Sequence, residues 1–203
     1  MPHRRPLCEA WPVSTELPFP DPLLQVNAVL LRPWNKTDVP SIVTACQDPT
    51  ISRWSPAIPY PYSEDDALGW LEQQEPARLA GASLDLAVVH ATSDEVLGAI
   101  GLGSVKIAQG TASIGYWLAP EARGHGYITS AVRLLVRWGF DRLGLARIEL
   151  TTGPENIASQ RVAERCGFRQ EGCLRSHMFV RHSGQRRDSI VYGLLPGDLA
   201  QPV

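Results

Sequence analysis

The sequence predicts a mixed α+β domain in which a mostly antiparallel sheet is flanked by helices. Apolar segments typical of strands lie at residues 83–90, 96–105 and 112–118, with only turns between them. Strands joined by short turns pair in antiparallel fashion, whereas parallel strands need longer crossover connections. Helical patterns lie on both sides of this group, and two further strand-like segments end the chain. These observations favour a sheet with helices packed on it over a regular alternation of strands and helices.

The composition is that of a soluble globular protein with one domain. The 203 residues are 44% hydrophobic and 20% charged, and the formal net charge is −2. Because there is no basic excess, we expect no nucleic-acid partner. Because no apolar run is long enough to span a bilayer, we expect no membrane partner. We expect a monomer or a homodimer.

The four cysteines are scattered and show no metal-ligand spacing; they are Cys8, Cys46, Cys166 and Cys173. We therefore expect free thiols in a reducing compartment, a cytoplasmic location and no bound metal. The basic residues at 3–5 are followed by proline, cysteine and glutamate instead of an apolar core, so the N-terminus does not resemble a secretory signal.

The chain divides into three parts. Residues 1–24 are rich in proline and lack periodicity, so we expect an extended N-terminal arm that packs on the surface or is disordered. Residues 25–198 form the predicted single domain, and residues 199–203 form a short C-terminal tail.

The first half of the domain begins with a predicted strand at residues 27–33 and a predicted helix at residues 36–47. A second helix is predicted from residue 63 to about residue 74, because Ser63 is a good N-cap and acidic residues follow it. The two helices are separated by a segment in which prolines prevent a long regular element.

That proline-rich segment carries three aromatic side chains, Trp54, Tyr60 and Tyr62. Such side chains offer apolar faces with polar tips. Two interpretations stay open: a rigid lid packed on the core, or one wall of a binding pocket.

The strand at residues 112–118 leads through a short loop into Gly124, Gly126 and the helical pattern of residues 128–143. The first N–H groups of a helix have no partner within it, and the helix dipole makes that end positive. An anion such as a pyrophosphate can bind to the backbone there, and Arg123 can add a charged fork. For two glycines alone, a tight strand-to-helix turn is the preferred interpretation, so other parts of the chain have to decide.

The last third of the chain continues the mixed pattern. Asn156 is a good N-cap for a helix that reaches Cys166, and Gly167 closes that helix. The predicted strands of this region lie at residues 146–152, 169–180 and 185–195, with a turn at 182–184.

Three motifs in this order resemble the GNAT superfamily of acyl-CoA-dependent N-acyltransferases, and within it the RimJ/RimL-type branch. The first motif runs from Ile114 through Gly124 and Gly126 to Tyr127. The second joins residues 156–159 to residues 166–168, and the third covers residues 184–195. The resemblance spans most of residues 27–198 and leaves the N-terminal arm outside.

The resemblance implies a GNAT-like fold with a splayed central strand pair and a binding site for acetyl-CoA. The glycine loop and helix start imply contacts to the pyrophosphate, and the preceding strand implies main-chain pairing with the pantetheine arm. Asn156 matches a residue that contacts the cofactor arm, although it can also serve only as a helix cap. The cofactor-binding residues implied in this way are Tyr116, Trp117, Leu118, Arg123, Gly124, His125, Gly126, Tyr127, Ile128, Asn156 and Ser159.

The catalytic and acceptor residues are less well specified. Ser159 matches a hydroxyl near the thioester sulfur, where it can donate a proton to the leaving thiolate, or it only fills the first turn of its helix. Tyr192 is the second catalytic candidate. Asp188 is a candidate for acceptor binding together with Trp54, Tyr60 and Tyr62, although Asp188 can equally hold the last hairpin.

The sequence departs from the family pattern at three places. Ser113 stands where related proteins carry a carboxylate on the strand before the glycine loop, so the general base stays unassigned. Glu121 replaces a glutamine or arginine, and Thr129 and Ser130 replace a glutamate after the loop. Other candidates for the base are Glu149, His177, Asp188 and Tyr192.

The implied function is an acetyl-CoA-dependent N-acetyltransferase that acts by direct attack through a tetrahedral intermediate. Its acceptor is a primary amine, either the α-amine of a protein such as a ribosomal protein or a small molecule such as an antibiotic or a metabolite. The alternative is a non-catalytic acyl-CoA-binding or sensing domain, which the missing strand carboxylate keeps open. A nucleotide-binding domain is disfavoured because three antiparallel strands precede the glycine loop.

Overall fold

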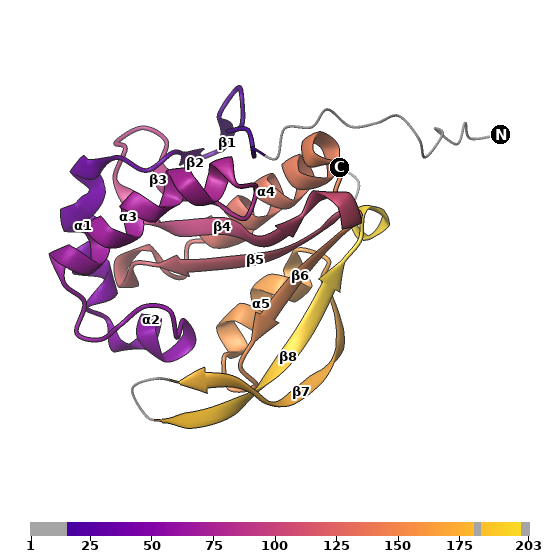
Figure 1. Ribbon diagram of the computed structural model, residues 1–203. Helices are drawn as coiled ribbons and strands as arrows, with labels where there is room; N and C mark the ends of the chain where they lie inside the picture. Colours follow the sequence, from indigo (N-terminus) through magenta and orange to yellow (C-terminus); the bar gives the residue numbers. More distant parts are fainter. Residues whose placement is uncertain (1–15, 181–183, 200–203) are drawn as a thin grey trace.

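A single sheet of eight strands forms the centre of the computed structural model, which describes residues 16–180 and 184–199 (Figure 1). The strand order is β1-β2-β3-β4-β5-β6-β8-β7, and every neighbouring pair is antiparallel except β5–β6. This arrangement confirms the predicted α+β class. The strands are β1 (Leu24–Val26), β2 (Val29–Arg32), β3 (Leu84–His90), β4 (Val96–Lys106), β5 (Thr111–Leu118), β6 (Arg147–Thr152), β7 (Arg169–Val180) and β8 (Gln185–Leu194).

Helices cover both faces of the sheet. On one face α4 packs over the main hydrophobic core, where Leu135 and Ile148 are completely buried. On the other face α1 and α3 enclose a smaller core around Ile42 and Ala67. The helices are α1 (Val39–Cys46), α2 (Pro49–Trp54), α3 (Glu64–Leu79), α4 (Tyr127–Leu143) and α5 (Ile157–Arg165).

The feature that matters most for the site is the parting of β5 from β6. The two strands pair only over Thr111–Ser113 on β5 and Arg147–Glu149 on β6. Beyond Ser113, β5 stays paired with β4 as far as Leu118, while β6 pairs with β8 on its other side. Figure 1 shows β6, β7 and β8 turning away from β5. The sheet is therefore splayed at its centre.

Two element boundaries differ from the sequence prediction. Residues 27–33 were predicted as one strand, but Asn27 adopts a left-handed φ of 49° and turns β1 into β2. Asn tolerates this conformation better than most residues. Helix α3 continues past residue 74 and through Pro76 to Leu79. Arg78 anchors this last turn through ion pairs with Glu75 and Glu16 at 2.8 and 2.7 Å.

Part of the predicted N-terminal arm belongs to the folded domain. Leu17 is 1% exposed within the main core, and its backbone N–H donates to the carbonyl of Arg78 at 3.0 Å. Leu24 begins β1. Residues 1–15, which make up most of the predicted arm, lie outside the described residues, as does most of the turn at 182–184.

The described cysteines are free thiols, with Cys46 and Cys166 buried and Cys173 exposed; Cys8 lies outside the described residues. Burial raises the pKa of Cys46 to about 12 and that of Cys166 to about 11, so both thiols stay protonated at neutral pH. Across residues 16–180 and 184–199, no helix is long and apolar enough to cross a membrane. The same residues contain no group of His, Cys, Asp or Glu side chains suited to a metal ion.

Candidate active site

The loop between β5 and α4 contains two glycines in the left-handed region. Gly124 has a φ of 83° and Gly126 a φ of 79°. A β-carbon added at either position would meet no atom within 4 Å, so the space above both residues is open. Glycine adopts positive φ without the steric cost that other residues have. Both the backbone conformation and the open approach therefore depend on glycine.

The start of α4 leaves its backbone donors free. Gly126 is the N-cap residue and supplies no side-chain cap, and the first helical N–H to find a partner is that of Ser130, bonded to the Gly126 carbonyl at 3.1 Å. Within the described part of the chain, the N–H groups of Tyr127, Ile128 and Thr129 have no hydrogen-bond acceptor. Such an end attracts anions through its N–H groups and the helix dipole.

Two aromatic side chains flank this helix start. The rings of His125 and Tyr127 stack with their centroids 5.4 Å apart and their planes 18° apart. The sequence-predicted loop residues are thus brought together around one anion-ready helix end.

Arg123 has partners that the sequence did not predict. Its guanidinium donates to the Leu118 carbonyl at 3.0 Å and forms an ion pair with Asp48 at 2.6 Å. Burial alone would raise the pKa of Asp48, but hydrogen bonds from Thr50 and Arg123 hold that pKa below its usual value. Asp48 is the N-cap of α2. The ion pair therefore ties the glycine loop to α2.

Tyr116 and Ser159 form a hydroxyl pair on the α4 face of the sheet. The phenolic oxygen of Tyr116 lies 2.9 Å from the hydroxyl oxygen of Ser159. Burial raises the pKa of Tyr116 to about 12, so its phenol is neutral at physiological pH. The pair joins β5 to the first turn of α5, beside the parted strands. The resemblance implied only a main-chain role for Tyr116, because the contact between the two side chains depends on the fold.

Asn156 lies one turn before Ser159 and caps α5. Its side-chain oxygen accepts the Ser159 backbone N–H at 3.2 Å. The capping role offered as an alternative in the sequence analysis is therefore present. Its side chain is half-buried, at the same end of α5 as the Tyr116–Ser159 pair.

The three aromatic residues at the end of α2 and after it lie in three different environments. Trp54 packs against Gly153, where an added β-carbon would come within 2.9 Å of the indole ring. Tyr62 is buried in the smaller core, whereas Tyr60 is 51% exposed. The structure supports the lid interpretation for Tyr62. For Trp54 and Tyr60, a role in the wall of a binding pocket stays a prediction.

Helix α2 reaches across to the other half of the sheet. Arg53 forms an ion pair with Glu155 at 2.8 Å, next to the contact between Trp54 and Gly153. Gly153 and Glu155, the residues that α2 contacts, both lie in the loop between β6 and α5. Since Asp48 at the other end of α2 holds Arg123, α2 contacts both sides of the parting between β5 and β6.

Tyr192 and Asp188 lie apart from this arrangement. Tyr192 is 1% exposed within the main core, and burial raises the pKa of its phenol. Asp188 is exposed and accepts the Ser176 backbone N–H at 2.8 Å, which fixes an irregularity in β7. These placements support packing for Tyr192 and the hairpin-holding alternative for Asp188. Their catalytic and acceptor roles stay predictions.

Ser113, which stands in place of the family's carboxylate, and the two remaining base candidates have structural partners or face solvent. Ser113 donates its hydroxyl to the Gly103 carbonyl at 3.0 Å. Glu149 accepts from Arg147 at 2.9 Å, and His177 is exposed on β7. None of the three contacts the Tyr116–Ser159 pair in the described residues.

A splayed central strand pair beside a helix start with free N–H groups defines the class of acyl-CoA-dependent N-acyltransferases that the sequence resembles. Residues 28–169, well over half of the chain, match the family model described as an acetyltransferase (GNAT) domain. The chain therefore belongs to the GNAT acetyltransferase family. Membership of this family makes the protein an N-acetyltransferase, so the enzyme is favoured over the alternative of a non-catalytic binding domain.

Individual relatives agree with this assignment. An uncharacterized N-acetyltransferase p20 of Bacillus licheniformis is 27% identical over 87% of this chain and 98% of its own length. A ribosomal-protein-serine acetyltransferase of Escherichia coli is 34% identical over 43% of this chain and 49% of its own. The solved structure of Mycobacterium smegmatis RimJ in complex with CoA-disulfide is 26% identical, has a TM-score of 0.79 and covers 88% of both chains.

Proposed function

We propose that this protein transfers the acetyl group of acetyl-CoA to the α-amine of a peptide or protein N-terminus. The observation that carries the proposal is the parting of β5 and β6 directly beside an anion-ready helix start. The similarity to a RimJ structure in complex with CoA-disulfide supports the proposed donor, and the similarity to a ribosomal-protein-serine acetyltransferase supports the proposed acceptor. A small-molecule amine is the alternative acceptor.

The pyrophosphate of acetyl-CoA is proposed to bind at the start of α4. The free N–H groups of Tyr127, Ile128 and Thr129 supply donors, and the positive φ of Gly124 and Gly126 leaves the approach open. Binding through main-chain donors fits a ligand of fixed negative charge. Arg123 adds a positive charge, which its ion pair with Asp48 partly neutralises.

The pantetheine arm is proposed to run along β5. From Ile114 onward, β5 has β4 on one side and no strand partner in β6 on the other. Main-chain groups on that open side can pair with the amides of an extended ligand. This path leads from the helix start to the point near Ser113 where the two strands part.

The thiol end of the arm then lies near the Tyr116–Ser159 pair. Ser159 is proposed to protonate the departing thiolate, with Tyr116 orienting the Ser159 hydroxyl. A main-chain N–H on the splayed part of β5 is proposed to stabilise the oxyanion of the tetrahedral intermediate. Holding both reactants in the slot supplies a large part of the rate enhancement.

The acceptor is proposed to enter beside α2 and the β7–β8 hairpin. Trp54 is the last residue of α2, Tyr60 follows α2 and is 51% exposed, and Phe179 on β7 is 49% exposed. Exposed apolar side chains at the mouth suit an extended peptide, whose main chain and side chains offer apolar contact along its length. This is the basis for preferring a peptide amine.

Calorimetric titration with acetyl-CoA, followed by a thiol-release assay, tests the proposal. The acceptors are a peptide with a free N-terminal serine, the same peptide with an acetylated N-terminus, and spermidine as a small amine. We expect tight binding and thiol release only with the free peptide amine. Release with spermidine alone would favour the small-molecule alternative, and binding without release would favour a sensor.

A further inference from the structure

A half-buried carboxylate lies on the face of the sheet opposite the Tyr116–Ser159 pair. Leu84 and Leu86 of β3 are buried in the main core, so Asp85 between them points to the face covered by α1 and α3. The side chain of Asp85 is hydrogen-bonded to Ser83. In the described part of the chain, no Lys, Arg or His lies within ion-pair distance of it.

The position of this carboxylate depends on a glycine in the neighbouring strand. Gly101 of β4 lies directly opposite Asp85. A β-carbon at Gly101 would come within 2.2 Å of Asp85 Oδ1, closer than any real contact. The Asp85 carboxylate therefore lies over β4 and extends sideways in the direction of β5.

The next residue in that direction is also a glycine. Gly115 of β5 lies opposite Gly101, is exposed, and has no atom within 4 Å of where its β-carbon would be. It follows Ser113, the last β5 residue paired with β6, by two positions. Neighbouring strands lie about 4.8 Å apart. An amine over Gly115 would thus be about one strand spacing from the carboxylate, a distance that one bridging water can span.

The two faces of β5 carry complementary groups. Successive residues of a strand point to opposite faces, so Gly115 faces the Asp85 side while Tyr116 faces Ser159. A thioester held between β5 and β6 would have a carboxylate on one side and a hydroxyl pair on the other. This arrangement suits an amine that arrives from one face and a thiolate that leaves toward the other.

We propose that Asp85 takes the proton from the acceptor ammonium where β5 and β6 part. The proposal rests on the proposed N-acetyltransferase function. The carboxylate accepts one proton from R–NH3⁺, which leaves a neutral amine. The nitrogen lone pair forms the C–N bond, the C–S bond breaks with its electron pair on sulfur, and the second nitrogen proton reaches that sulfur through the hydroxyl pair. Protonated Asp85 then returns its proton to water.

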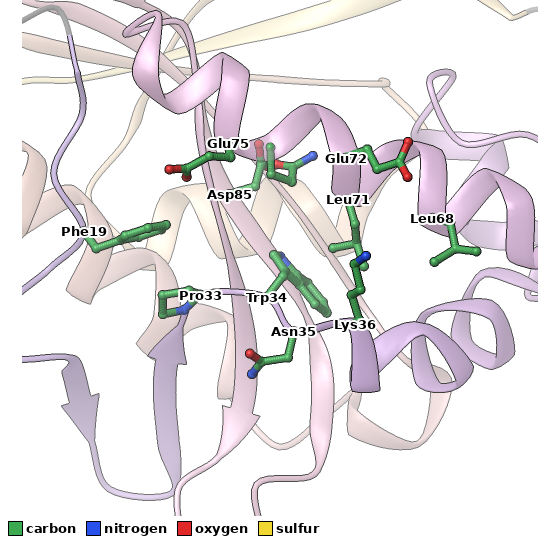
Figure 2. Close-up of a pocket in the computed structure, with 11 residues that line it drawn as sticks. Phe19, Pro33, Trp34, Asn35, Lys36, Leu68, Leu71, Glu72, Glu75 and Asp85 are labelled. Carbon is green, nitrogen blue, oxygen red and sulfur yellow. The ribbon is translucent and has the colours of Figure 1, made fainter.

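A water-accessible pocket gives that proton a way out. Asp85 lines a pocket of about 200 Å³ between β3, α3 and the segment after β2. Figure 2 shows Asp85 above the indole of Trp34, with Phe19 and Leu71 at the sides. The Trp34 Nε1 group is buried without a partner in the described residues, which suits it to donate to a water there.

The electrostatic setting suits a base that works near neutral pH. Burial raises the pKa of Asp85 to about 6, close to the range in which a general base is most effective. The other charged groups that line the pocket are Lys36, Glu72 and Glu75, and Glu75 is paired with Arg78. Asp85 therefore remains charged at pH 7 and can accept a proton.

The test compares the pH dependence of kcat/KM for the amine in the wild type and in Asp85→Asn. The wild type should hold a plateau between about pH 6 and the pKa of the amine, about 8 for an α-amine. The variant can use only amine that is already neutral. Since that fraction rises tenfold per pH unit below the pKa of the amine, its kcat/KM should rise tenfold per pH unit over that range. At pH 6 we expect a loss of about 100-fold, within the range that general base catalysis provides.

Two controls make the result specific. Glu72→Gln removes a carboxylate that lines the same pocket from α3, and it should keep the wild-type profile. The affinity of Asp85→Asn for acetyl-CoA, measured by calorimetry, should stay within about twofold of the wild-type value, because the proposed acetyl-CoA site at the start of α4 does not include Asp85. An Asp85→Asn profile that coincides with the wild type would overturn the proposal while leaving the N-acetyltransferase function intact. A wild type that binds acetyl-CoA but releases no thiol with any amine would overturn both.

Discussion

The Tyr116 phenol and the Ser159 hydroxyl lie 2.9 Å apart and link β5 to α5 at the place where β5 leaves β6. Since the raised pKa of Tyr116 keeps the phenol protonated, the pair has protons to give and no negative charge to repel a thiolate. A hydroxyl held in this way is suited to protonate a leaving group.

Replacing Tyr116 by Phe should slow turnover more than it weakens donor binding. We expect kcat to fall about tenfold or more, because the Ser159 hydroxyl loses its orienting partner. The KM for acetyl-CoA should change less than about twofold. Ser159→Ala should have a similar effect, and the double variant should be little worse than either single one, since the two act as a unit. Steady-state kinetics measure all three variants.

Ser93→Ala is the matched control for Ser159→Ala, since it removes a hydroxyl from an exposed side chain in the turn between β3 and β4. It should retain wild-type kcat. Equal losses of kcat in Ser93→Ala and Ser159→Ala, or strictly additive losses in the double variant, would contradict a coupled hydroxyl pair.

Replacing Gly126 by Asp should weaken donor binding through charge. A carboxylate at the start of α4 would repel the pyrophosphate, and we expect the KM for acetyl-CoA to rise about tenfold or more. Gly126→Asn is the control, because the Asn side chain has nearly the shape of Asp without its charge. Asn also tolerates the positive φ of 79° at this position. If Asp and Asn raised KM equally, backbone strain would explain the effect and the anion site would be in doubt.

Replacing Asp48 by Asn should strengthen donor binding. Asn still caps α2, but it no longer holds the Arg123 guanidinium by charge. Calorimetry at low salt should show a Kd for CoA that is lower by about two- to fivefold, the usual size of a partly exposed ion pair. The gain should shrink as salt is added. Asp94→Asn, in an ion pair with Arg32, is the control. Weaker binding in Asp48→Asn would mean that Asp48 is needed to position Arg123.

Replacing Asp85 by Asn should stabilise the protein above pH 6. The pKa of Asp85 in the folded protein, about 6, lies above its ordinary value of 3.8, so folding favours the protonated form. The resulting stability is fully present below about pH 4 and is lost as the pH rises through 6. Relative to the wild type, the Asn variant should gain about 3 kcal/mol in unfolding free energy at pH 7.5 and little near pH 4.

Urea titrations at the two pH values measure this difference. A gain of the same size at both pH values would show that shape or hydrogen bonding, and not charge, sets the effect. A loss of stability at pH 7.5 would mean that the charged carboxylate has a stabilising partner.

Local patterns were enough to predict most of the fold. The glycine turn, the helix that follows it and the cap at Asn156 all depend on neighbours within a few residues, so the sequence shows them directly. The hairpin at Asn27 was missed because one residue with positive φ makes the turn. The extension of α3 through Pro76 was missed because distant partners of Arg78 hold it.

The sequence directly indicated the main-chain part of the candidate site, whereas the roles of Asn156 and Ser159 came from the resemblance. Side chains from different strands and helices meet through sheet register, which no local pattern records. Asp85 meets Gly101 across a strand pair, and Tyr116 meets Ser159 from 43 residues away. A carboxylate inside an otherwise apolar strand was the one signal that could have drawn attention to Asp85.

The open helix start has a consequence for how such a protein changes over time. Peptide N–H groups are supplied by every residue except proline, so the proposed acetyl-CoA site built from them would tolerate substitution at His125, Tyr127 and Ile128 while Gly124 and Gly126 stay fixed. The proposed acceptor site consists instead of side chains from α2 and the segment after it. New amine preferences can therefore arise there by substitution, with the use of one common acyl donor inherited unchanged.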